Sequence, residues 1–136
     1  MSADINIYNP EGLGQPLGLY KHMTRVKASE LLVIAGQLSV DRDGNIIGEG
    51  DFAAQMTQVF SNIRTALRSA GADFADIVKF TTYVKHASDI DEFMRVRERL
   101  WADFFPGGDY PPNTLLVVSR LVHDAFLIEV ETTAAL

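Results

Sequence analysis

The sequence predicts an α+β domain in which two helices pack on one face of a six-stranded mixed sheet. Two segments carry apolar residues at the helical spacing of three and four, and six others have the apolar or alternating pattern of strands. Their order is β-β-β-α-β-α-β-β. Because each helix is too long to be a hairpin turn, both should cross over the sheet and leave its other face open.

The composition fits one globular domain over residues 1–136. With 47% hydrophobic and 22% charged residues, the chain differs from disordered sequences. Its net charge of −6 disfavours a nucleic-acid partner, because such binding relies on cationic contacts. We find no signal peptide and no apolar run near the roughly 18–20 residues that cross a bilayer. We therefore expect a cytoplasmic protein without a membrane partner.

Three short strands are predicted before the first helix. Residues 9–18 contain three glycines and two prolines and indicate an irregular leader. Strands are predicted around 19–27 and at 31–35, the second being a short apolar run. A turn signal at Asp43-Gly44 indicates a hairpin into a third strand within 40–47.

The first helix is predicted to begin after Asp51, a typical N-cap residue, and to end at Gly71. Its apolar stripe consists of Phe52, Met56, Val59, Phe60, Ile63, Leu67 and Ala70. An alternating strand over 78–85 follows.

The second helix is predicted to begin within Ser88–Asp91, with a capping-box-like spacing, and to end before Pro106. Two strands, over 113–119 and 126–132, close the chain. The apolar face of the helix consists of Ile90, Phe93, Val96, Leu100, Trp101 and Phe104. The helical arginines are expected on solvated faces, paired with acidic neighbours: Arg64, Arg68, Arg95, Arg97 and Arg99.

The open face of the sheet requires a partner, and self-association is the commonest solution, so we expect an oligomer. The sequence contains no cysteine, no metal-binding arrangement of its three histidines, no Gly-x-Ser-x-Gly and no phosphate-binding loop. We therefore predict neither a metal nor a cofactor.

Three places offer polar groups to a ligand. Tyr20 follows the leader, and two prolines in the segment 110–114 stiffen the backbone before Asn113. Glu129 and Glu131 alternate with apolar residues in the last strand. Each place also has an ordinary structural explanation, as a loop-to-strand junction or as solvent-facing carboxylates.

Five segments, in this order, resemble the RidA/YjgF family, also called the endoribonuclease L-PSP family. They are Ile34–Gln37, Ser69–Ala72, Asp76–Lys85, Pro112–Val118 and Ile128–Glu131. The resemblance implies a chorismate-mutase-like α+β fold, a homotrimer and ligand clefts between neighbouring subunits. It also implies hydrolysis of small enamines and imines, such as 2-aminoacrylate, to 2-keto acids and ammonia without a cofactor.

The resemblance also implies a set of site residues. By position, Tyr20 is similar to a family tyrosine and Glu129 to a family glutamate, which together place the attacking water. Main-chain groups near Gly36 and Leu115, and the ring of Tyr83, would line the cleft.

The family clamps a substrate carboxylate with the arginine of Pro-Ala-Arg-(Ser/Thr), but this chain reads Pro111-Pro112-Asn113-Thr114. An amide has neither the charge nor the two-pronged donor of a guanidinium. The loss of a contact worth about 1.5–3 kcal/mol should weaken carboxylate binding roughly tenfold to a hundredfold. Either the ligand lacks that carboxylate, or another cation, such as Arg25 or Lys21, reaches the cleft.

The departure at Asn113 resembles the arginine-lacking subgroups of the family, and it leaves three functions to compare. The first is an imine or enamine hydrolase in which Glu129 polarises water, Asn113 binds a neutral substrate group and Tyr20 orients the substrate. The alternative is a non-catalytic small-molecule binder on the same trimer. An endoribonuclease is the least favoured, because the chain is acidic and lacks a basic aromatic groove.

Overall fold

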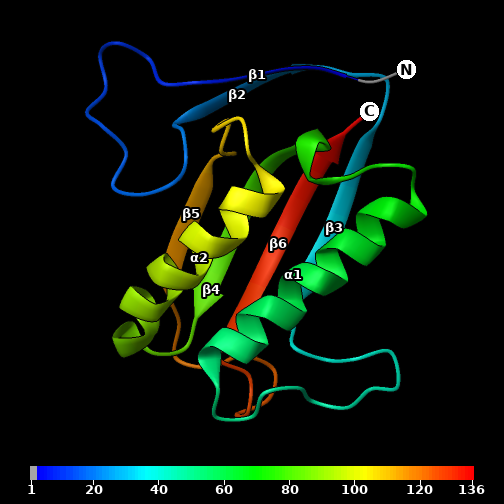
Figure 1. Cartoon of the computed structure of the whole chain (residues 1–136), viewed down its shortest axis with the longest axis vertical. Helices are drawn as coiled ribbons and strands as arrows, with labels where there is room; N and C mark the ends of the chain where they lie inside the picture. The colour runs from blue at the N-terminus through cyan, green and yellow to red at the C-terminus, as the bar shows by residue number, and fades with distance from the viewer. Residues whose placement is uncertain (1–2) are drawn as a thin grey trace.

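The computed structural model describes residues 3–136 and confirms an α+β architecture with two long helices (Figure 1). Both helices cover the same face of the main sheet, and the opposite face carries no helix. The elements in chain order are β1 (Asp4–Tyr8), β2 (Met23–Lys27), β3 (Leu31–Gln37), α1 (Phe52–Ser69), η1 (Phe74–Asp76), β4 (Ile77–Val84), η2 (Ala87–Asp89), α2 (Ile90–Phe104), β5 (Asn113–Val117) and β6 (Ile128–Ala135).

The six strands form two sheets, so the prediction of a single six-stranded sheet is wrong for this structure. β1 and β2 form an antiparallel pair, and the other four strands are ordered β3-β6-β4-β5. The Thr24 hydroxyl on β2 donates to the Val78 carbonyl at 2.8 Å, so β2 lies against the beginning of β4 and not alongside β3. In Figure 1 the two-stranded pair accordingly crosses one end of the main sheet.

The strands before α1 differ from those predicted. Sequence patterning missed β1, and β2 begins at Met23 instead of near residue 19. The predicted third strand within 40–47 is a loop that keeps the expected turn but makes only one bridge, Val40 to Ile46. Its backbone groups are instead satisfied locally, with the Asp41 carboxylate accepting from Asp43 N and Asn45 N at 2.9 Å each.

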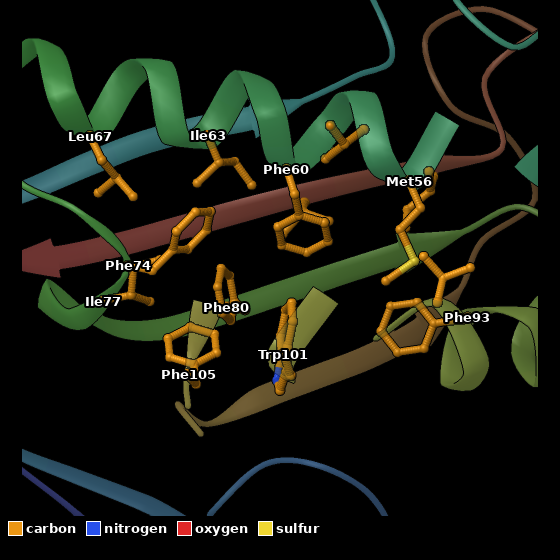
Figure 2. Packing of buried hydrophobic residues seen from close by; sticks show 14 of the residues in the cluster. Met56, Phe60, Ile63, Leu67, Phe74, Ile77, Phe80, Phe93, Trp101 and Phe105 are labelled. Carbon is orange, nitrogen blue, oxygen red and sulfur yellow. The ribbon is translucent and has the colours of Figure 1, made fainter. Parts of the chain in front are cut away.

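Helix α1 has the predicted ends. The Asp51 carboxylate accepts from Ala54 N at 3.1 Å and so caps the first turn, and Gly71 adopts a φ of +76° just past the last turn. From Phe52 to Leu67 the predicted apolar stripe is buried against β3 and β6. Figure 2 shows these side chains meeting an aromatic cluster built around Phe60, Phe80 and Trp101.

Helix α2 begins differently from the prediction. The 3₁₀ turn η2 leads into it, and its first residue is preceded by Asp89, whose side chain makes no capping hydrogen bond. The reciprocal capping box of this chain lies instead at Asp73 and Asp76, in η1. The apolar face itself is as predicted, with Phe93, Val96 and Trp101 buried in the core.

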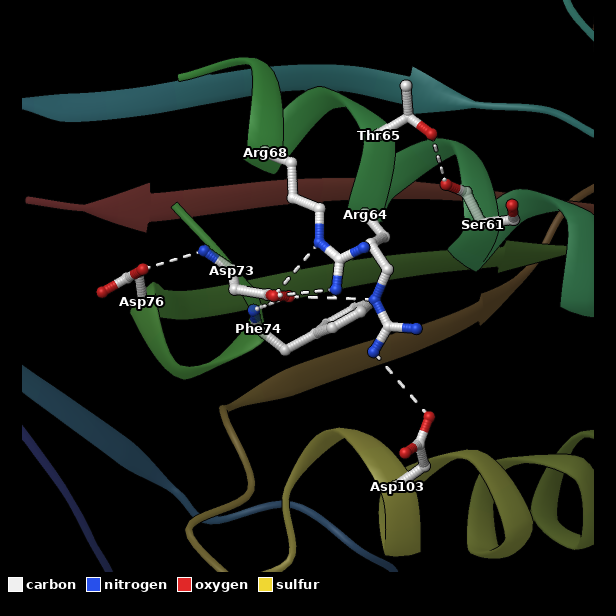
Figure 3. A network of polar contacts seen from close by, with 8 residues as sticks. All are labelled: Ser61, Arg64, Thr65, Arg68, Asp73, Phe74, Asp76 and Asp103. Carbon is white, nitrogen blue, oxygen red and sulfur yellow. Dashed lines mark hydrogen bonds and ion pairs between the residues drawn. The ribbon is translucent and has the colours of Figure 1, made fainter. Parts of the chain in front are cut away.

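The arginines of α1 form ion pairs that link this helix to Asp73, at the start of η1, and to α2. Arg64 lies over the rings of Phe74 and Phe104 and is within 3.8 Å of Asp73 and 3.7 Å of Asp103. Arg68 also pairs with Asp73. As Figure 3 shows, this network joins α1, η1 and α2 on the outer side of the core, away from the open face of the sheet. None of the helices described in the structure has the length and apolar character needed to span a membrane.

Candidate functional site

The open face of the sheet gathers the acidic and phenolic side chains predicted as functional. In the antiparallel pairing of β4 with β6, Tyr83 is the partner of Glu129 and Thr81 is the partner of Glu131. Phe80 and Thr82 alternate with them and are buried on the helix side. Tyr83, Glu129 and Glu131 therefore share the face that the helices leave uncovered.

A short hydrogen bond joins two members of this group. The Tyr83 hydroxyl donates to Glu131 Oε1 at 2.5 Å. That bond, more than burial or the charge of the two glutamates, raises the pKa of the Tyr83 phenol. The phenol therefore stays protonated and keeps Glu131 in place beside Glu129.

Gly36 makes room for the Glu129 carboxylate. The register of β3 against β6 shifts between Ile34 and Gln37, so β3 bulges in the segment that contains Gly36. A Cβ atom at position 36 would lie 1.9 Å from Glu129 Oε2, far inside van der Waals contact. Only a residue without a side chain allows Glu129 to lie across the β3 backbone.

Burial raises the pKa of Glu129, and the charge of Glu131 adds to the shift. A carboxylate with a raised pKa is a stronger base, and it also holds a proton more readily near neutral pH. The glutamate that the resemblance singles out is thus suited to take a proton from water and return it.

Asn113 lies on the other face of the sheet. It is the partner of Phe80 at the beginning of β5, and its Oδ1 accepts a hydrogen bond of 2.8 Å from the buried Thr82 hydroxyl. Leu115 likewise packs against the core, whereas Thr114 pairs with Thr81 and belongs to the open face. Within one chain the structure therefore brings Thr114, but not the Asn113 side chain, to the face of Glu129.

Tyr20 lies in the leader before β2. Its hydroxyl accepts from Leu17 N at 3.3 Å, and its ring contacts His22 edge-on at 6.1 Å between centroids. None of the side-chain hydrogen bonds that Tyr20 makes in residues 3–136 reaches β6. These contacts of Tyr20 thus lie within the leader and the residues just before β2.

The two cations considered as substitutes for the family arginine have other surroundings. Lys21 Nζ pairs with Asp109 at 3.2 Å, and Arg25 is exposed on β2 opposite Asn6. The prediction that Arg97 lies on a solvated face is wrong, because this side chain is only 2% exposed. Its position four residues after Phe93 and four before Trp101 was the signal in the sequence.

Across residues 3–136 no three histidine, aspartate or glutamate side chains are placed to hold a metal ion. The chemistry that the open face offers is that of two carboxylates, one phenol and main-chain amides. Such a set can move a proton and orient water.

Comparisons with known proteins agree with the resemblance. The chain matches the family described as Endoribonuclease L-PSP over residues 14–136. It is 36% identical to a RutC family protein of Pyrococcus horikoshii, across 91% of this chain and 92% of that one. A RutC family protein of Pyrococcus abyssi is 34% identical across 88% of each chain. The crystal structure of YyfB from Yersinia pestis, described as a Rid family protein of unknown function, superposes with a TM-score of 0.86 and 31% identity, covering 97% of this chain and 98% of that one.

Proposed function

This chain belongs to the endoribonuclease L-PSP family, the RidA/YjgF proteins, and on that premise we propose that it is a cofactor-independent hydrolase of small imines or enamines. The observation that carries the proposal is the placement of Glu129. Its carboxylate lies over the Gly36 backbone, next to Glu131, with its pKa raised by burial.

Hydrolysis of an imine requires water to add to the carbon of the C=N bond. In the proposed step the imine binds protonated on nitrogen, and the Glu129 carboxylate accepts a proton from water as the oxygen bonds to carbon and the C=N π electrons pass to nitrogen. The protonated Glu129 then gives its proton to the nitrogen of the resulting carbinolamine. As the C–N bond breaks, the hydroxyl proton returns to Glu129, ammonia and the carbonyl product are released, and Glu129 passes its proton to the ammonia or to solvent. Tyr83 and Glu131 hold the neighbouring wall of the site through their hydrogen bond.

In this proposal Asn113, which lies on the other face of its own sheet, sets the substrate preference at the Glu129 of a neighbouring subunit. Its Oδ1 is already occupied by the Thr82 hydroxyl, which leaves the amide nitrogen as a donor. An amide donor suits a neutral oxygen on the substrate. The proposed substrates therefore differ from 2-aminoacrylate in carrying a neutral polar group where that molecule carries its carboxylate.

The proposed site is completed by neighbouring subunits of a homotrimer. The open face carries apolar side chains that are unusual at a free surface: Val33 is 80% exposed, Leu31 59% and Leu116 46%. Burying these side chains against a second copy would remove them from water. It would also bring the leader or β5 of one chain towards the open face of the next.

Replacing Val33 with glutamate is expected to convert the oligomer to monomers, because three charges would be buried at the shared face. Light scattering coupled to gel filtration measures the mass directly. Val122→Glu provides the matched control, since Val122 is 74% exposed in the loop between β5 and β6. A wild type that elutes as a monomer would contradict the trimer.

The hydrolase proposal is tested by following ammonia released from freshly generated imines. We expect the wild type to hydrolyse imines that carry a neutral polar group faster than 2-aminoacrylate. Asn113→Arg should reverse this order and raise activity on 2-aminoacrylate about tenfold or more, the value of a charge-assisted contact. A wild type that binds such compounds but releases no ammonia from any of them would favour the non-catalytic alternative.

A further inference from the structure

Arg97 is the largest fully buried side chain in the described part of the chain. Its guanidinium Cζ lies 4.9 Å from the centroid of the Phe93 ring. Nη2 is 3.0 Å from Met94 Sδ, a weak acceptor, and Nε has no hydrogen-bond partner. The Tyr20 phenol lies near enough to favour the charged guanidinium, but no carboxylate of residues 3–136 neutralises it.

The burial of Arg97 therefore costs desolvation free energy, which only an opposite charge or further hydrogen bonds could offset. No carboxylate of residues 3–136 lies within 4.0 Å of its nitrogen atoms, although the chain has 18 Asp and Glu against 12 Lys and Arg. Burial lowers the pKa of Arg97 to about 10, which still leaves the guanidinium charged at neutral pH. Buried charges in proteins are normally paired, so this charge lacks the anionic partner that such a group usually has.

A groove leads to this charge. Its volume is about 570 Å³, and it lies between the leader and α2. The walls are mainly apolar, and they include Leu17, Leu19, Met94, Ala102 and Tyr110. At Gly18 the leader comes so close that a Cβ atom would lie 2.2 Å from Arg97 Nη2.

We propose that this groove binds a small organic monocarboxylate, with its carboxylate on the Arg97 guanidinium and its apolar part against Leu19 and Met94. A guanidinium with unpaired N–H groups matches the geometry of a carboxylate. This site is distinct from the face of Glu129, and the inference does not rest on the proposed hydrolase activity.

The groove favours a monoanion over inorganic phosphate. Apolar walls solvate an alkyl chain but not a strongly hydrated phosphate dianion. Glu98 also lines the groove, without forming an ion pair with Arg97, and its negative charge repels a dianion more than a monoanion.

The test is a calorimetric titration of the full chain with 2-oxobutanoate, alongside inorganic phosphate and the neutral 2-oxobutanamide. We expect saturable binding of 2-oxobutanoate and weaker binding of phosphate and 2-oxobutanamide. In a parallel NMR titration, 2-oxobutanoate should shift the Arg97 Nε–H resonance. Arg97→Met should weaken carboxylate binding by about tenfold or more, the value of a charge-assisted contact. Gly18→Ala should also weaken it, because the added methyl displaces Nη2.

Two controls keep the result interpretable. Arg95→Met removes an exposed arginine that pairs with Glu92 on the same helix, and it should leave binding unchanged. Arg97→Met should fold at least as stably as the wild type, because it replaces an uncompensated buried charge with an apolar side chain of similar length. Equal binding by Arg97→Met and wild type, no saturable binding by the wild type, or tighter binding of phosphate would each overturn the proposal.

Discussion

Replacing Glu129 with glutamine is expected to reduce kcat for imine hydrolysis by about 10²–10⁴-fold, the usual contribution of a positioned general base. Glutamine keeps the shape of the side chain and its place over Gly36, but it cannot accept a proton from water. The rate of ammonia release under saturating substrate measures the loss. An unchanged kcat in Glu129→Gln would remove Glu129 from the mechanism.

Two further variants separate the chemistry of Glu129 from its position. Gly36→Ala keeps the carboxylate but forces it away, since the added methyl would lie 1.9 Å from Oε2. The atoms that must move, Oε2, Cδ and Cγ, all belong to the Glu129 side chain and none to the backbone, so activity should fall while the fold survives. Glu131→Gln should lower the pKa of Glu129, because it removes the second cause of the shift. The acid limb of the pH–rate profile should then move to lower pH.

Replacing Gln55 with leucine is expected to lower the free energy of unfolding by about 2–3 kcal/mol, since it leaves the Ala125 carbonyl and the Leu127 N–H without a partner. The Gly48 carbonyl, by contrast, still accepts from Asp51 N. Gln55 is completely buried in α1. Its Nε2 donates to the carbonyls of Gly48 and Ala125, and its Oε1 accepts from Leu127 N at 2.8 Å. One side chain thus holds two loops, including the one that leads into β6 and Glu129.

Chemical denaturation monitored by Trp101 fluorescence measures this loss. Gln58→Leu is the matched control three residues along the same helix, because the Gln58 amide donates only to Asn62 Oδ1. Its cost should be within about 1 kcal/mol, the value of a single hydrogen bond. Equal costs for Gln55→Leu and Gln58→Leu would show that the Ala125 carbonyl and the Leu127 N–H find other partners.

Much of the candidate site could be predicted from the order of short motifs. Glu129, Tyr83 and Gly36 lie in the segments that resemble the family, and the structure places all three on or beside the open face. The contact between Gly36 and Glu129 was not predictable, since it depends on a bulge that joins strands more than 90 residues apart in the sequence. The face of Asn113 was not predictable either, because it follows from the register of β5 on β4.

The sequence by itself determined the α+β class, the family and the ends of α1, because apolar periodicity and helix capping depend on neighbours in the chain. Only the tertiary structure decided where the N-terminal strands lie and which side chains share the open face, since both depend on long-range register. The tertiary structure also decided that the Arg97 side chain is buried. Local composition predicts a solvated arginine, but the apolar stripe of α2 carries the residue into the interior, where its charge has no partner in the described chain.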